Sequence, residues 1–221
     1  MIEDVDESLR SLVRRSALGG ADVEIAFDAP TREWSARRNA PTVDLYLYDI
    51  REDLARRQVE WIPVRADDGR VTERRPPDRY YKLSYLVTAW TQRPEDEHRL
   101  LSAVLACFVM HETLPTDVLA GSLAGRDDPL FATIALPTPA DRSLSDVWSA
   151  LGGELKPSLD LVICAPLTDG RARVAGPPVL EEPRIEITQA AGRHVPEALD
   201  ETVRAGSEAR PGRIVRVRRR P

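Results

Sequence analysis

The histidines are the first residues to examine for chemistry, because imidazole is the commonest metal ligand among side chains. There are three of them, His98, His111 and His194. The first two lie on one predicted helix, and their separation of 13 residues turns their directions apart by roughly 140°. No HExxH spacing brings a second ligand close to either. The sequence therefore predicts solvated helix histidines and no metal site.

Acid–base chemistry would need two carboxyl groups that converge in a cleft. The acidic clusters are Glu95–Glu97, Asp67–Asp68, Asp127–Asp128 and Glu181–Glu182. Each falls at a predicted helix start, turn or linker, where acidic residues are common without catalysis. Ser102 and Ser149 lack the sequence around a nucleophile elbow. We predict no catalytic residue and no cofactor, and an enzyme with a concealed carboxylate site stays an open alternative.

The two cysteines, Cys107 and Cys164, each lie within an apolar run. This placement favours small buried hydrophobic side chains in a reducing compartment. The acidic start of the chain does not resemble a secretory leader. The longest apolar run falls far short of the roughly 20 residues that span a bilayer. We expect a soluble protein in the cytoplasm that has no membrane partner, and release from the cell stays an open alternative.

The strongest charge feature is a run of six arginines and no acid in residues 210–221. The whole chain has a formal net charge of −5, so removing these six positive charges leaves the other residues at −11. Phosphates could bind such a run, but it contains no aromatic residue for base stacking. Val215 and Val217 alternate with arginine, so the segment could instead add to a sheet edge. A disordered tail, a protein-binding arm and a nucleic-acid arm all remain open.

Trp34 lies among arginines in a predicted loop, and Trp61 lies in a charged hairpin. Tryptophan and arginine often anchor interfaces, although each indole could equally close the edge of its own core. Our candidate interface residues are Trp34, Arg37, Arg38, Trp61, Arg213, Arg216, Arg218, Arg219 and Arg220.

The elements that must position these residues centre on residues 79–105. Alternating apolar and aromatic residues predict a strand that is covered on both faces. Pro94 and the three acidic residues after it are typical of a helix start. Leu101, Val104, Leu105 and Phe108 then form an apolar stripe that must pack on the sheet.

Weaker patterns predict the remaining elements. We expect a helix over residues 2–18, short strands at 23–27 and 43–48, and a loop between them at 28–41. The turn Asp67–Arg70 predicts a hairpin of residues 57–64 and 71–74. Further strands are expected in residues 131–137, 159–164 and 184–189. A helix is expected over 143–151, with Ser143 and Asp146 as a capping box.

This order predicts an α+β fold with a mixed β-sheet and helices packed mainly on one face. Residues 1–180 form the predicted domain. Residues 181–221 form an extended C-terminal arm, since prolines and glycine crowd residues 176–184 and few later residues can build a core.

Three stretches together carry a family resemblance. They are Phe27–Asp53 (FDAPTREWSARRNAPTVDLYLYDIRED), Arg75–Leu105 (RPPDRYYKLSYLVTAWTQRPEDEHRLLSAVL) and Leu144–Leu167 (LSDVWSALGGELKPSLDLVICAPL). Over residues 2–180 the chain resembles the N-terminal domain of the cap proteins of contractile injection systems, which are similar to phage tail terminators. The resemblance implies a six-fold homomeric ring at the end distal to the baseplate. That ring would terminate the inner tube and anchor the last sheath ring of an assembled particle.

Such a cap would act through shape, which agrees with the lack of reactive groups in the sequence. Its partners would be other copies of itself and the tube and sheath proteins. The alternative function is a nucleic-acid-binding accessory protein that uses the arginine-rich arm.

Overall fold

The computed structural model describes residues 1–137, 143–168 and 170–176. The chain divides into two units, Met1–Ala175 and Gly176–Pro221, and all the described elements lie in the first. The predicted strand at 184–189 and the arginines from Arg210 to Arg220 lie outside the described residues. These features and the predicted domain boundary after residue 180 stay predictions.

The first unit contains helices and strands in the mixed order that the sequence predicts. The α-helices are α1 (Ile2–Leu12), α2 (Arg32–Ala36), α3 (Pro94–Met110) and α4 (Leu144–Ala150). The strands are β1 (Glu24–Ala26), β2 (Thr42–Glu52), β3 (Ile62–Arg65), β4 (Val71–Arg75), β5 (Arg79–Trp90), β6 (Phe131–Ile134), β7 (Leu159–Leu167) and β8 (Arg173–Val174). A π-helical turn, η1 (Val13–Ala17), continues α1, and 3₁₀ turns lie at η2 (Leu54–Arg56), η3 (Thr116–Val118) and η4 (Gly121–Leu123).

A five-stranded sheet in the order β1-β2-β5-β7-β6 forms the body of this unit. β1 runs parallel to β2 and every other pair is antiparallel, which confirms the predicted mixed sheet. The long strand β5 is its centre, and every residue from Leu83 to Ala89 is buried. Alternating apolar residues on both faces of β5 require this covered position, as the sequence predicts.

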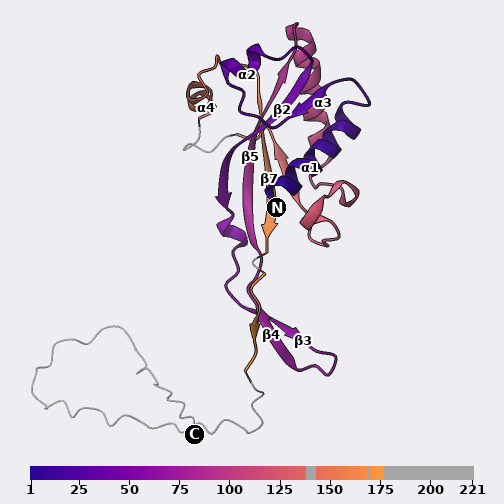
Figure 1. Cartoon of the computed structure of the whole chain (residues 1–221), viewed down its shortest axis with the longest axis vertical. Coiled ribbons are helices and arrows are strands. Elements are labelled where there is room, and N and C mark those ends of the chain that lie inside the picture. The colour runs from indigo at the N-terminus through magenta and orange to yellow at the C-terminus, as the bar shows by residue number, and fades with distance from the viewer. Residues whose placement is uncertain (138–142, 169, 177–221) are drawn as a thin grey trace, which may run out of the picture. The chain divides into compact units, whose positions relative to one another are not determined.

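The two long helices, α1 and α3, cover one face of this sheet (Figure 1). Leu9 of α1 and Phe108 of α3 pack there in one cluster with Leu45, Tyr85 and Ile163 of the strands. Pro94 lies in the first turn of α3, and three acidic residues follow it at the positive end of the helix dipole. The expected α+β fold with the main helices on one face is therefore confirmed.

The other face of the five-stranded sheet is covered at one end by three indole rings. Trp90 of β5 lies 5.5 Å from Trp34 of α2 and 6.5 Å from Trp148 of α4, measured between ring centroids. Lys156 lies 4.1 Å above the Trp90 ring and forms an ion pair of 2.6 Å with Glu97. The segment between α4 and β7 is thus held against the sheet by a partly buried charge pair.

Two local predictions were wrong on this face. The expected loop at 28–41 contains α2, because Thr31 caps it by accepting a hydrogen bond from the Trp34 amide and the indole packs on Trp90. Ser143 does precede α4, but its side chain makes no capping hydrogen bond and lies 2.6 Å from the hydroxyl of Ser145. The capping box is therefore absent, although the helix forms where expected.

A separate three-stranded sheet has the order β3-β4-β8. The predicted hairpin is confirmed, although its first strand begins at Ile62 rather than at residue 57. β8 pairs with β4 through only two residues and was not predicted. The antiparallel order brings the end of β2, the start of β5 and the end of β7 to one end of the five-stranded sheet. The chain continues from there into the three-stranded sheet (Figure 1).

Candidate functional site

One of the predicted interface residues, Trp61, lies directly before β3 of the three-stranded sheet. Its indole is half-buried, and the Arg173 guanidinium lies 4.8 Å above the ring. Around this contact both faces of the sheet are exposed, since Thr72 to Arg75 of β4 and both residues of β8 are exposed. The Arg173 guanidinium thus packs on the Trp61 ring, and the residues of β4 and β8 around it are exposed.

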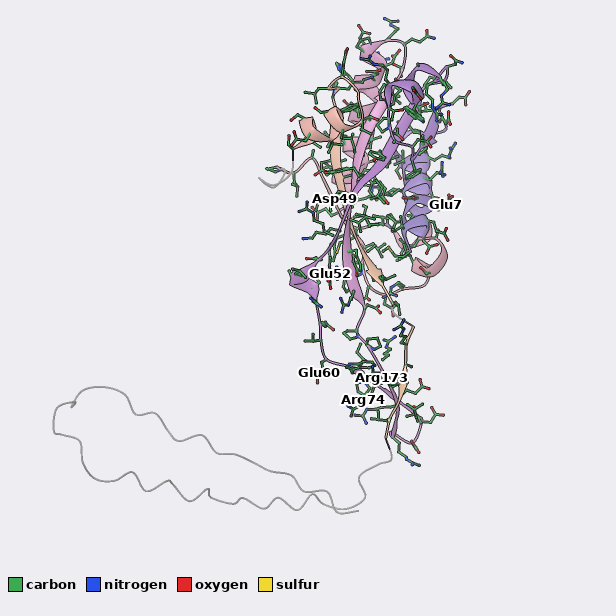
Figure 2. All side chains as sticks on the ribbon, turned by 60° about the vertical axis from the view of Figure 1, so that its left-hand side comes forward. Glu7, Asp49, Glu52, Glu60, Arg74 and Arg173 are labelled. Atoms are coloured by element: carbon green, nitrogen blue, oxygen red, sulfur yellow. The ribbon has the colours of Figure 1, made fainter. Side chains whose placement is uncertain are left out.

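Register places two positive charges together on this sheet. Arg74 of β4 lies directly opposite Arg173 of β8. Side chains at opposite positions of an antiparallel pair lie on the same face, with Cβ atoms about 5 Å apart. Figure 2 labels both side chains on the small sheet. Neither Arg74 nor Arg173 was predicted from the sequence as an interface residue. The alternation of Arg171–Val174 is a short signal that could have indicated a strand there.

The hairpin turn has the geometry that its sequence requires. Gly69 adopts a φ of 80°, in the region that glycine tolerates best. The Asp68 carboxylate accepts a hydrogen bond of 2.9 Å from the amide of Arg70. The acidic pair Asp67–Asp68 therefore shapes a turn.

The other predicted interface residues lie at the tryptophan-covered end of the five-stranded sheet. Trp34 is only 7% exposed and donates through its indole nitrogen to Asp28 at 2.9 Å. Arg38 lies 4.4 Å above the Trp34 ring and forms ion pairs with Glu24 at 2.6 Å and Asp28 at 3.0 Å. Both side chains are therefore bonded within their own chain, where they hold the segment that contains α2.

Arg37 lies at the surface after α2, and the structure does not bring it together with Trp61. It is exposed, and its Nε donates to the backbone carbonyl of Glu33. Beside it, a groove of about 590 Å³ runs between residues 38–41 and the start of α3, with Trp90, Arg93 and Arg99 in its lining. The hypothesis that Trp34, Arg37, Arg38 and Trp61 form an interface remains a prediction, and the arginines of the arm lie outside the described residues.

A buried carboxyl group lies close to this end of the sheet. Asp44 of β2 is fully buried, and its Oδ1 accepts a hydrogen bond of 3.1 Å from the Asp28 amide. Its Oδ2 has no hydrogen-bond partner among the described residues. Burial raises the pKa of Asp44 to about 8, because the charged form would lose its hydration. Asp44 is therefore held in its neutral form at neutral pH.

The two thiols are not activated for nucleophilic chemistry. Burial raises the pKa of Cys107 and of Cys164, whereas a reactive cysteine needs a lowered pKa. Both cysteines are buried and free, as the sequence analysis expects of small hydrophobic side chains.

The candidate acid–base and metal-binding residues lie on different elements. His111 follows α3 and donates through Nδ1 to the carbonyl of Cys107. Glu97 accepts from Lys156, whereas Asp128 accepts from Arg126 and from Tyr80. In residues 1–137, 143–168 and 170–176, no group of three or more His, Cys, Asp or Glu side chains could hold a metal ion. No helix in this part of the chain is long and apolar enough to cross a membrane.

Comparison with known proteins identifies a family for most of the chain. The profile of the Pvc16 N-terminal domain matches residues 4–182. The chain belongs to the Pvc16 N-terminal domain family. No curated protein matches the sequence.

Two solved structures with a similar fold are both described as terminators. One is the PVC sheath/tube terminator of an extracellular contractile injection system in the extended state, with a TM-score of 0.63, 23% identity and 86% of this chain covered. The other is the anti-feeding prophage cap, a tube-terminating cap, with a TM-score of 0.58, 22% identity and 82% of this chain covered. The matches cover 65% and 60% of those chains, so this chain spans less than two thirds of either. They establish that this Pvc16-family member has the terminator-like α+β fold.

Proposed function

We propose that this protein is a structural cap of a contractile injection system. It forms a ring at the end distal to the baseplate, terminates the inner tube and anchors the last sheath ring. The observation that carries the proposal is its family membership, together with the fold it shares with a sheath/tube terminator and a tube-terminating cap.

Closed edges on the five-stranded sheet support this role. The outer carbonyl of Ile25 in β1 accepts a hydrogen bond of 2.7 Å from Arg10. At the other edge, the amide of Ala132 in β6 donates to the carbonyl of Glu112 at 2.8 Å. A terminator needs a body that does not add further strands in an uncontrolled way, and covered edges provide this property.

A ring also needs two different surfaces on each subunit, because closed head-to-tail contacts join unlike patches. The tryptophan-covered end and the three-stranded sheet are two such unlike surfaces of the first unit. We propose a homohexameric ring with the tube and sheath proteins as partners, acting in the cytoplasm as part of the particle. The proposed role is structural, with no reaction and no cofactor.

The nucleic-acid alternative depends entirely on the arginines from Arg210 to Arg220. These residues lie outside the described part of the chain, and no observation in the described part favours the alternative. The cap is therefore the function that we propose.

Assembly with the tube and sheath proteins of the particle tests the proposal. We expect tubes formed with this protein to reach a defined length and to end in a ring-shaped density in electron micrographs. Tubes formed without it should vary in length. Light scattering of the purified protein should reveal a ring-sized species or a species that forms on contact with the tube. A persistent monomer that binds neither protein would overturn the proposal.

A further inference from the structure

Among the described residues neither face of the three-stranded sheet is buried, although register places Ile62, Val64 and Val174 on the face opposite to Arg74 and Arg173. Three strands need a hydrophobic face or a covering helix for stability of their own. Here every residue of β3 and β4 after the first is exposed, and so are both residues of β8. Within the described residues, no helix packs on either face. The surface is therefore open to a partner.

Charge indicates what kind of partner fits. Arg74 and Arg173 lie opposite each other on one face, and like charges at opposite positions destabilise a strand pair. Neither arginine forms an ion pair with a carboxylate in the described part of the chain. Arg173 is instead positioned by its contact with the Trp61 ring. Two adjacent guanidinium groups favour a carboxylate, which can accept hydrogen bonds from both.

The two outer edges of this sheet, which pair with no further strand among the described residues, indicate where an extended partner could pair. Pro63 in β3 has no amide hydrogen to donate, so a further strand would pair poorly with the β3 edge. On the opposite side, the amide of Ala175 donates to the carbonyl of Thr72. Because bonded and non-bonded positions alternate along an antiparallel pair, the peptide groups of Val174 point away from β4. The β8 edge therefore presents a donor and an acceptor beside the two arginines.

We propose that the three-stranded sheet binds an extended acidic segment of another protein. The segment pairs with the β8 edge at Val174 and places a carboxylate between Arg74 and Arg173. The arginine-rich end of this chain has the wrong charge for this position. The inference deepens the proposed function and rests on it, since it states the chemistry by which the cap contacts a neighbouring subunit of the particle.

A peptide-binding measurement on the full chain tests this inference without the particle. The probe is a fluorescent peptide of alternating glutamate and valine, and the matched control replaces each glutamate with glutamine. We expect the glutamate peptide to bind with one-to-one stoichiometry and to weaken as salt rises. The glutamine peptide should bind about tenfold more weakly, because it lacks the charge-assisted hydrogen bonds. A third peptide, N-methylated at alternate amides, should also lose affinity, because it cannot pair with a strand edge.

Variants then assign the site. The double variant Arg74→Glu/Arg173→Glu should lower the affinity for the glutamate peptide at least about tenfold. The control is Arg14→Glu, which makes the same charge change at an exposed position on η1 and should leave the affinity unchanged. Thermal unfolding of each variant checks that the fold is kept. The double variant Arg74→Lys/Arg173→Lys should bind the glutamate peptide with intermediate affinity, because lysine keeps the charge but lacks the planar guanidinium group.

Two results would overturn the inference. One is equal binding of the glutamate and glutamine peptides, or no binding of either to the full chain. The other is unchanged affinity in the double glutamate variant. A protein that fails these tests but still ends tubes in a ring would leave the proposed function standing. A protein that binds the peptide through Arg74 and Arg173 but never caps tubes would contradict the proposed function alone.

Discussion

The two sheets of the first unit differ in how far their side chains are buried. In the five-stranded sheet, side chains on both faces of β5 are buried and the outer edges are covered. In the three-stranded sheet, the faces are exposed, and two arginines lie opposite each other without a carboxylate partner in the described residues. The first sheet is stabilised by its own packing, whereas no described residue of this chain covers the faces of the second sheet. In this fold the five-stranded sheet therefore provides stability, and we propose that the three-stranded sheet provides recognition.

Truncation of a core side chain should have the largest effect. Phe108 is 2% exposed and packs between α3 and the sheet. Phe108→Ala should lower the free energy of unfolding by about 3–5 kcal/mol, from lost burial and the cavity left behind. Urea unfolding followed by circular dichroism measures this change. Val64→Ala on β3 is the matched control and should cost less than about 0.5 kcal/mol; an equal cost in both variants would erase the contrast between the sheets.

The buried carboxyl group of β2 should make stability depend on pH. The folded-state pKa of Asp44, about 8, lies above its ordinary value of 3.8. The contribution of Asp44 to the free energy of unfolding is largest below pH 3.8, where the carboxyl group is protonated in both the folded and the unfolded chain. It then falls as pH rises towards 8, because the unfolded chain loses the proton that the folded chain keeps. The slope should be about 1.4 kcal/mol per pH unit.

Asp44→Asn removes the titrating group but keeps an acceptor for the Asp28 amide. Urea unfolding between pH 5 and pH 8 should therefore give a flatter profile for this variant, and higher stability than the natural protein at the upper end. Asp22→Asn, at an exposed position, should leave the profile unchanged. Parallel profiles for the natural protein and Asp44→Asn would show that Asp44 is already ionised in the fold.

Loss of the helix cap at α2 should have a moderate effect. Thr31→Ala removes the side-chain oxygen that accepts from the Trp34 amide, at an expected cost of about 1 kcal/mol. Thr31→Ser keeps the acceptor and should cost less. Thermal unfolding compares the two variants. Equal costs for alanine and serine would mean that the methyl group of Thr31, and not its hydroxyl, matters.

The smallest effect on stability should come from the arginine pair. Arg74→Ala relieves the repulsion from Arg173, so the free energy of unfolding should change by less than about 0.5 kcal/mol and should not fall. Thermal unfolding at low salt measures it, with Arg14→Ala as the control. A clear loss of stability would mean that Arg74 has a stabilising partner within its own chain, which would weaken the contrast between the two sheets.

Much of the fold could be predicted because its patterns are local. The alternation in residues 79–90 and the Pro94 start of α3 each lie within one element, and so does the turn at Gly69. Residue spacing within a segment sets which side chains share a face, so the covered central strand and the packed helix followed directly from the order of residues.

Other features depended on partners distant in sequence. The helix α2 forms where a loop was expected, because Trp34 packs against Trp90 of β5, which is distant in sequence. β8 is too short to have a periodicity of its own, and only its pairing with β4 makes it a strand. Prediction from sequence could therefore name Trp61 as an interface candidate but could not identify Arg173 as the residue that covers it.

The sequence by itself determined the order of the elements, the amphipathic faces of the long helices and the charge imbalance of the chain. Only the tertiary structure decided that Trp34 is buried while Val174 is open, and that Arg74 lies opposite Arg173. The physical reason is that periodicity is a property of neighbouring residues, whereas strand register is fixed by the free energy of packing segments that the chain brings together from about 100 residues apart.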